Sequence, residues 1–127
     1  MTSPTIPHLV NLTPHHIRVL GDNDTLLCAL PPTHTPARCH ETTQPAGELR
    51  LGSEKKALPL VRLRLGDVTG LPEPSAGTWH IVSRLVADAL PQRTDLLVPH
   101  DVVRDSEGQI TGCRALAIGA AQHPMEP

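Results

Sequence analysis

Residues 61–65 read Val-Arg-Leu-Arg-Leu, which is the cleanest alternation of apolar and charged residues in the chain. Successive side chains of a β-strand point to opposite faces, so this spacing places Val61, Leu63 and Leu65 on one face and both arginines on the other. The pattern is typical of a strand with one face on the core and the other in water. It predicts a protein built largely of sheet.

Short strand-like segments separated by turn residues lie on both sides of this stretch. We expect them at 17–20, 25–30, 37–40, 78–82, 96–98, 102–104 and 109–113. The sequence Gly21-Asp22-Asn23-Asp24 predicts a turn that joins the first two as a β-hairpin, and residues 105–108 predict another with Gly108 at positive φ. Residues 41–57 are polar and predict a surface loop or an irregular hairpin.

One helix is expected, at about residues 83–90. Ser83 is a good N-cap, Pro91 stops the helix, and the apolar face between them consists of Leu85, Val86, Ala89 and Leu90. These elements predict an α+β fold: a single domain over 1–127 of mainly antiparallel strands with one short helix, with a barrel-like sheet as one arrangement. Loose tails are expected at about 1–7 and 119–127.

Composition excludes several classes of function. The net charge is −2 and Trp79 is the only aromatic residue, so neither a positive field nor stacking platforms are available for nucleic acid. No stretch approaches the roughly 18 apolar residues of a membrane helix, and residues 1–8 do not resemble a secretory signal. Three cysteines at irregular spacing favour reduced thiols, and hence a cytoplasmic protein, over a disulfide framework.

The sequence shows no catalytic or cofactor motif. The eight histidines and the pair Cys39-His40 lack the paired spacing of metal ligands, so no metal is predicted. Cys113, Cys39 and Ser83 are the candidate nucleophiles, but no base is identified for the thiols, and Ser83 lacks the flanking glycines of a hydrolase elbow. Glycine-rich phosphate loops are also absent, so we predict no cofactor and favour a non-catalytic protein.

The most specific functional hypothesis is a pocket for a small anion. A helix start presents free N–H groups, and guanidinium groups add donors suited to phosphate or carboxylate. The polar residues near a turn at 11–15 supply further hydrogen-bonding groups. The predicted ligand-binding residues are Asn11, Thr13, His15, Ser83, Arg84, Arg104 and Arg114. The alternatives are that residues 11–15 form a structural turn and that the arginines are solvated charges on outer faces.

Four segments of the chain resemble, in the same order, a group of small uncharacterised bacterial and phage proteins. They are Asn-Leu-Thr-Pro-His at 11–15, Val-Thr-Gly-Leu-Pro-Glu-Pro at 68–74, Ile-Val-Ser-Arg-Leu-Val-Ala at 81–87 and Val-Arg-Asp-Ser-Glu-Gly-Gln-Ile-Thr-Gly-Cys-Arg at 103–114. The resemblance covers most of the chain and implies a cytosolic accessory protein of a phage or its host. It brings no catalytic residues.

Three functions follow from these observations. The first is a non-catalytic binding protein for a small anionic or nucleotide-like ligand. The second is a protein-interaction module or homodimeric accessory subunit, and the third is a small hydrolase that uses His or Cys. The first requires a concave polar pocket, the second an exposed apolar patch, and the third close His, Cys or carboxylate partners.

Overall fold

The computed structural model describes residues 7–33 and 35–120 and confirms an α+β fold made mainly of strands. In chain order its elements are β1 His8–Asn11, β2 Ile17–Leu20, the 3-10 turn η1 Asp22–Asp24, β3 Leu26–Leu30, β4 Arg38–Leu51, β5 Lys56–Thr69, β6 Thr78–Ile81, α1 Arg84–Ala89, β7 Leu96–Arg104 and β8 Ile110–Ala117. The predicted tails lie almost entirely outside the described residues.

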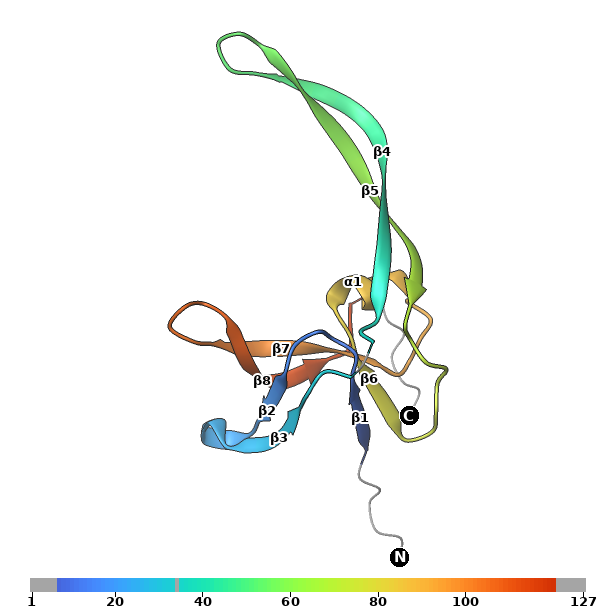
Figure 1. Cartoon of the computed structure of the whole chain (residues 1–127), viewed down its shortest axis with the longest axis vertical. Helices are drawn as coiled ribbons and strands as arrows, with labels where there is room; N and C mark the ends of the chain where they lie inside the picture. Colours follow the sequence, from blue (N-terminus) through green and yellow to red (C-terminus); the bar gives the residue numbers. More distant parts are fainter. Residues whose placement is uncertain (1–6, 34, 121–127) are drawn as a thin grey trace, which may run out of the picture.

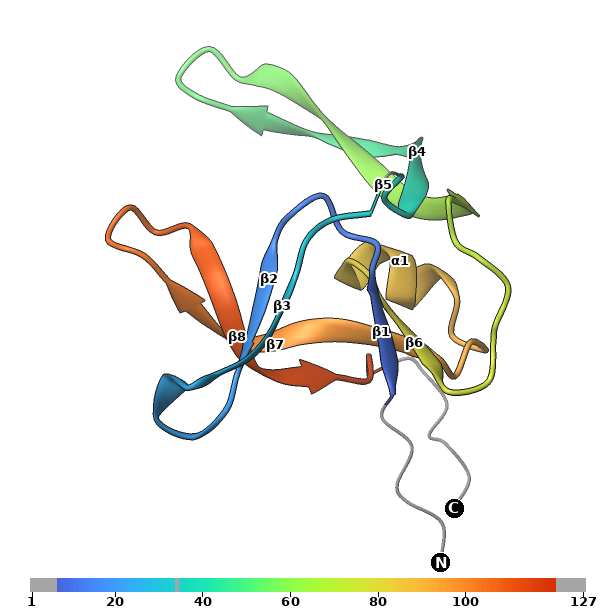
Figure 2. The same cartoon turned by 60° about the horizontal axis from the view of Figure 1, so that its bottom comes forward.

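Six strands form a nearly closed, barrel-like sheet in the order β1-β6-β7-β8-β2-β3 (Figure 2). The hairpins β2–β3 and β7–β8 are antiparallel, as expected from their turns. Short parallel ladders join β1 to β6, β6 to β7 and β2 to β8. At the seam between β1 and β3, the Asn11 side-chain amide donates to the Leu30 carbonyl oxygen at 3.0 Å.

Two apolar clusters cover the two faces of β6 and β7. Side chains alternate along the chain here, so that Val82, directly after β6, and Leu96 of β7 belong to one cluster, and Ile81 and Leu97 belong to the other. The first cluster includes Val86 of α1, and the second includes Ile17 and Cys113 of the barrel wall: its buried members are Ile17, Ile81, Leu97 and Cys113. The core is therefore almost wholly aliphatic, as the composition requires.

Two expectations about single elements were wrong. Leu85 was placed on the buried face of the helix, but it is 45% exposed because the six-residue α1 turns Val86 and Ala87 inward. Residues 96–98 and 102–104 are one strand, β7, which continues through Pro99. A proline is tolerated there because β6 pairs only with Leu96 and Leu97, which leaves that edge of β7 free from Val98 onward.

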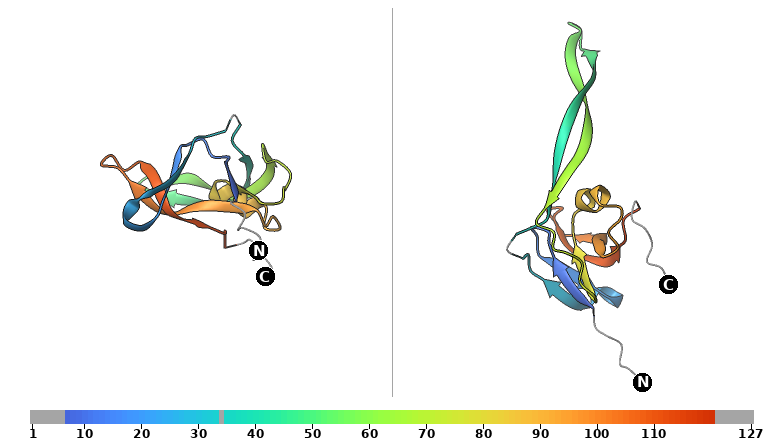
Figure 3. Two further views of the ribbon diagram at one scale, coloured as in Figure 1. Left: turned by 90° about the horizontal axis from the view of Figure 1, so that it is seen from below. Right: turned by 90° about the vertical axis from the view of Figure 1, so that its right-hand side faces the viewer.

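The largest departure from expectation is a long hairpin, β4–β5, that we call the arm (residues 38–69). The hairpin alternative for residues 41–57 is correct, but each strand has 14 residues, and the ladder is interrupted by two irregularities. Figures 1 and 3 show the arm projecting from the rest of the described chain, the body, with α1 against its base. Its strands pair only with each other, which accounts for the tolerance of Pro45 and Pro59.

The stretch 61–65 lies in this arm and is not half-buried as predicted. Val61, Leu63 and Leu65 are 53%, 64% and 41% exposed. The alternation correctly predicted a strand, but alternation alone does not show that a second layer covers the apolar face. In the described structure no layer does.

Candidate functional site

One cleft of about 850 Å³ lies between the start of α1, the base of the arm and the β7–β8 hairpin. Its volume is within the range of small-molecule sites. Most of its lining is apolar, from Pro14, Ile17, Pro36, Ala37, Val82, Leu85, Val98, Pro99, Val102 and Ile110. Five of the seven predicted binding residues also line it: Thr13, His15, Ser83, Arg84 and Arg104.

In the part of the chain that the structure describes, the residues with a formal charge along this cleft are all arginines. Arg38 begins β4, Arg84 begins α1 and Arg104 ends β7, so the ends of three elements bring their cations to one cleft. No Asp or Glu within residues 7–33 and 35–120 lines it. Among the described residues Arg38 and Arg84 make no ion pair or side-chain hydrogen bond, while Arg104 Nη1 donates to the Gly108 carbonyl oxygen at 2.8 Å.

Arg38 is the site residue that sequence analysis missed. The strand expected at 37–40 contained it, but nothing in the sequence indicated that this strand begins beside the helix start. His16 also lines the cleft, next to the predicted His15. Both histidines are exposed and add hydrogen-bonding ring nitrogens.

Ser83 acts as the N-cap of α1, as predicted. Its backbone is extended (φ −71°, ψ 160°), and its Oγ accepts a hydrogen bond from the Val86 N–H at 3.3 Å. The Ser83 hydroxyl therefore already accepts a hydrogen bond from one of the N–H groups that the anion hypothesis assigned to the ligand. Because α1 has only six residues, the positive character of the cleft is attributed to its guanidinium groups and not to the helix.

The 11–15 segment is a compact turn held by Asn11, which is 2% exposed. Asn11 Oδ1 accepts hydrogen bonds from the Thr13 N–H and hydroxyl at 2.9 and 2.7 Å. Its amide donates to the carbonyl oxygens of His15 at 2.7 Å and Leu30 at 3.0 Å. Asn11 does not line the cleft, and these four bonds commit its polar atoms to the fold. The exposed side chain of His15 lines the cleft, and its ring makes no hydrogen bond to another described residue.

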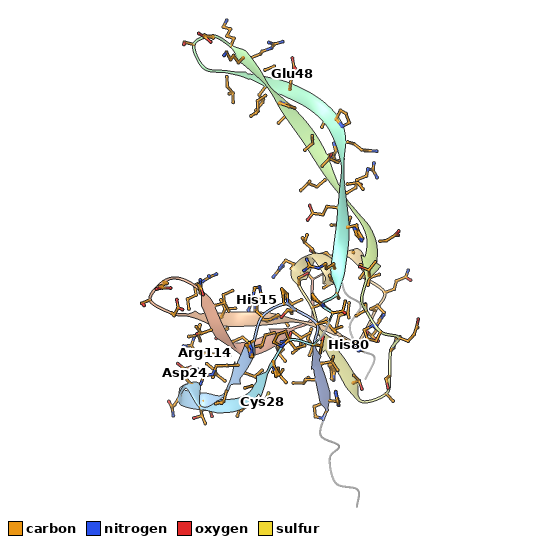
Figure 4. The ribbon with its side chains drawn as sticks, in the orientation of Figure 1. His15, Asp24, Cys28, Glu48, His80 and Arg114 are labelled. Carbon is orange, nitrogen blue, oxygen red and sulfur yellow. The ribbon has the colours of Figure 1, made fainter. Side chains whose placement is uncertain are left out.

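Arg114 lies outside the cleft, beside the β2–β3 turn (Figure 4). Its Nε and Nη2 donate to the two carboxylate oxygens of Asp24 at 2.6 and 3.0 Å. Asp101 adds a longer contact at 3.6 Å. The hydrogen bonds from Arg114 lower the pKa of the Asp24 carboxyl, so the two form a fixed surface pair.

The two thiols at the cleft are poorly suited to nucleophilic attack. Cys113 is fully buried, and burial raises the pKa of its thiol, which favours the protonated form. Cys39 is half-buried, and its Sγ contacts the carbonyl oxygens of His40 and Gly66 at 3.7 and 4.0 Å. Neither thiol is hydrogen-bonded to the imidazole ring of a histidine among the described residues.

A buried polar network lies elsewhere in the body and was not anticipated. His80, 3% exposed, pairs through Nδ1 with Asp95 Oδ2 at 2.9 Å. Arg93 donates to both Asp95 oxygens at 2.8 Å and to the Pro72 carbonyl oxygen at 3.0 Å. The Arg93 hydrogen bonds and, secondly, His80 lower the pKa of Asp95 although partial burial opposes this. The network ties β6 to the loop before β7.

Within residues 7–33 and 35–120, no group of three His, Cys, Asp or Glu side chains is placed to hold a metal ion. His34, one of the histidines near Cys39, lies outside the described residues. None of the helices in these two ranges has the length and apolar character needed to span a bilayer. Comparisons with protein-family models, curated proteins and solved structures found no match.

Proposed function

We propose that the protein binds a small anionic ligand with an aliphatic part in the arginine-lined cleft, without catalysing its reaction. The observation that carries the proposal is that Arg38, Arg84 and Arg104 line one cleft to which the described residues contribute no carboxylate. A guanidinium group recognises carboxylate or phosphate through paired N–H donors. The apolar remainder of the lining suits an aliphatic chain.

The source of the affinity is local, because the whole chain carries a net charge of −2. Two of the three guanidinium groups have no ion-pair partner among the described residues, so an anion need not displace one of their carboxylates. A nucleotide is a less favourable ligand, since no aromatic side chain lines the cleft to stack on a base. We therefore place aliphatic carboxylates and phosphate monoesters ahead of nucleotides.

A thermal-shift screen tests this proposal. The panel consists of aliphatic carboxylates and alkyl phosphates, with nucleotides and sugar phosphates as comparison ligands. A ligand at about 100 times its Kd stabilises the folded state by about 2.7 kcal/mol, which is a readily measured shift. Arg84→Ala should abolish the shift of the best ligand.

Arg114→Ala is the matched control, since it removes the same group from a site outside the cleft. We expect it to leave the ligand shift unchanged. Equal losses in the two variants would show that binding follows total charge and would contradict the proposal. So would a screen in which no anion stabilises the protein.

The second candidate function is that of a protein-interaction module, and the arm is the observation that favours it. A two-stranded hairpin is marginally stable alone in water, yet this one exposes seven large aliphatic side chains: Leu49, Leu51, Leu58, Leu60, Val61, Leu63 and Leu65. Such a surface is typical of a contact with another protein. In both candidates we place the protein in the cytoplasm as an accessory protein of a phage or its host, which the three free cysteines support.

A further inference from the structure

Two of the three cleft arginines lie at one end of the cleft. Arg84 begins α1 and Arg38 directly follows Ala37, and Ala37 packs with Val82 and Val98 in one apolar cluster. A backbone hydrogen bond of 2.9 Å from the Val82 N–H to a carbonyl oxygen of β7 holds the start of α1 beside this part of the strand. Arg38 and Arg84 therefore enter the cleft at the Val98 end of β7.

The third arginine, Arg104, enters the cleft at its other end. It is the last residue of β7, six positions after Val98. A strand advances about 3.3 Å per residue, so the two backbone positions lie about 20 Å apart. Figures 1 and 2 show the turn between β7 and β8 well away from α1. A guanidinium contacts an anion at about 2.8 Å, so one carboxylate or phosphate group does not span this distance.

The described lining between these two ends is apolar. Pro99 and Val102 lie on β7 between Val98 and Arg104, and both line the cleft. Ile17 lines it too and belongs to the same apolar cluster as Val102. These side chains offer no hydrogen-bonding group, so an aliphatic segment of a ligand suits this stretch.

The β7–β8 turn fixes Arg104 without neutralising it. The hydrogen bond from Nη1 to the Gly108 carbonyl oxygen at 2.8 Å uses one of the five N–H donors of the guanidinium group. The neighbouring carboxylate of Asp105 accepts hydrogen bonds from the N–H groups of Glu107 and Gln109 at 2.9 and 3.0 Å. Among the described residues it makes no ion pair with Arg104, whose remaining donors are left for a ligand.

We propose that the ligand of this cleft carries two anionic groups joined by an aliphatic segment, one group held by Arg38 and Arg84 and the other by Arg104. The inference rests on the proposed function and names its class of ligand. A ligand with a single anionic head would leave the cations at one end without a partner. A phosphate carries about −1.5 to −2 charges at neutral pH, so it suits the end with two arginines, and a carboxylate suits Arg104.

Isothermal titration calorimetry of the full chain tests this class of ligand. The probes are α,ω-dicarboxylates from succinate to dodecanedioate, ω-phosphonocarboxylates of the same lengths, and the monoamides of the dicarboxylates. A monoamide has the same shape as its dicarboxylate but one charge fewer, so it is the matched control. At the best length the dicarboxylate should bind about tenfold or more tightly than its monoamide, because hydrogen bonds to a second charged group are added. We expect the phosphonocarboxylate of that length to bind more tightly still.

The two levels of the proposal fail in different ways. Equal affinities of dicarboxylate and monoamide at every length overturn the two-anion ligand and leave the proposed function intact. Binding by none of the three series overturns both. An advantage of the dicarboxylate that is confined to a narrow range of lengths supports two separate anion positions, since shorter ligands cannot reach both ends.

Variants assign the two ends of the ligand. Arg104→Ala should reduce the affinity of the dicarboxylate to that of its monoamide, whereas Arg84→Ala should weaken both ligands. Arg104→Gln is measured alongside because it keeps a donor for the Gly108 carbonyl oxygen, and melts of the ligand-free variants report whether the turn is intact. Arg114→Ala, outside the cleft, is the control. A dicarboxylate advantage that persists in both Arg104 variants, or that is lost equally in Arg114→Ala, overturns the assignment of Arg104.

Discussion

Replacement of Asn11 by alanine should destabilise the protein more than any single change on its surface. The side chain is 2% exposed and takes part in four hydrogen bonds, three within the 11–15 turn, with Thr13 and His15, and one to the carbonyl oxygen of Leu30. A hydrogen bond contributes about 1 kcal/mol net, and buried groups left unpaired cost more. Water can reach His15, which is exposed, so the expected loss is about 3–4 kcal/mol.

A loss of this size is a large part of the 5–15 kcal/mol that a domain has available, at about 0.05–0.15 kcal/mol per residue. It corresponds to a decrease of about 12–16 °C in Tm for a chain of this length. Thermal melts and urea titrations of the variant and the wild type would measure it. Because the bond to Leu30 joins the ends of β1 and β3, the same variant should also show faster amide exchange along this seam.

Thr13→Val is the matched control for Asn11→Ala. It removes the hydroxyl that donates to Asn11 Oδ1 but leaves the two bonds from the Asn11 amide in place. We expect a loss of about 1 kcal/mol. If Asn11→Ala costs no more than Thr13→Val, the seam is not held by the asparagine amide, and the reasoning is refuted.

Three further predictions concern the cap, the buried network and the thiols. Ser83→Ala should cost about 1 kcal/mol, because the Val86 N–H loses its acceptor, whereas an unchanged melt would contradict the N-cap role. Asp95→Asn should cost about 2 kcal/mol at neutral pH by leaving Arg93 poorly paired. The folded-state pKa of Asp95 is lowered, so the ionised carboxylate stabilises the folded state at pH values above the ordinary pKa of about 4. This stabilisation is lost as the pH falls through the folded-state pKa. The free energies of unfolding of the variant and the wild type, measured by urea titration, should therefore converge in acid. Cys113 should remain unlabelled by a maleimide in the native protein and react on unfolding, and rapid native labelling would show that its burial is incomplete.

Local signals in the sequence were sufficient for the hairpins and the helix. The turn at 21–24 and the turn at 105–108 each join strands as predicted, with Gly108 at φ +84°. Ser83 and Pro91 marked the ends of α1. Each of these features is determined by neighbouring residues, through hydrogen bonds within a turn or the geometry of proline and glycine.

Features that depend on distant residues were not predictable in the same way. β1 has only four residues, directly after a proline-rich segment, and it is a strand because β6 pairs with it. The arm was underestimated because residues 41–57 are polar and contain Gly47 and Gly52, which are typical of loops, although a solvent-exposed hairpin accommodates both. For the cleft, Arg84 and Arg104 could be proposed from the helix start and the strands, but Arg38 could be placed there only once the fold was known.

The pairing of the first strands with the last ones sets the order in which this chain can fold during synthesis. β1 is completed by residues 78–81, and Val19 of β2 is paired with Cys113 of β8, so the barrel cannot close until most of the chain has left the ribosome. The arm has only local pairs and can form earlier. Its aliphatic side chains are then exposed on every nascent chain. On one mRNA, the arm of a nascent chain would therefore meet chains on neighbouring ribosomes whose barrel has not yet folded. Ribosome profiling that measures association between nascent chains as a function of their length would detect such early contacts.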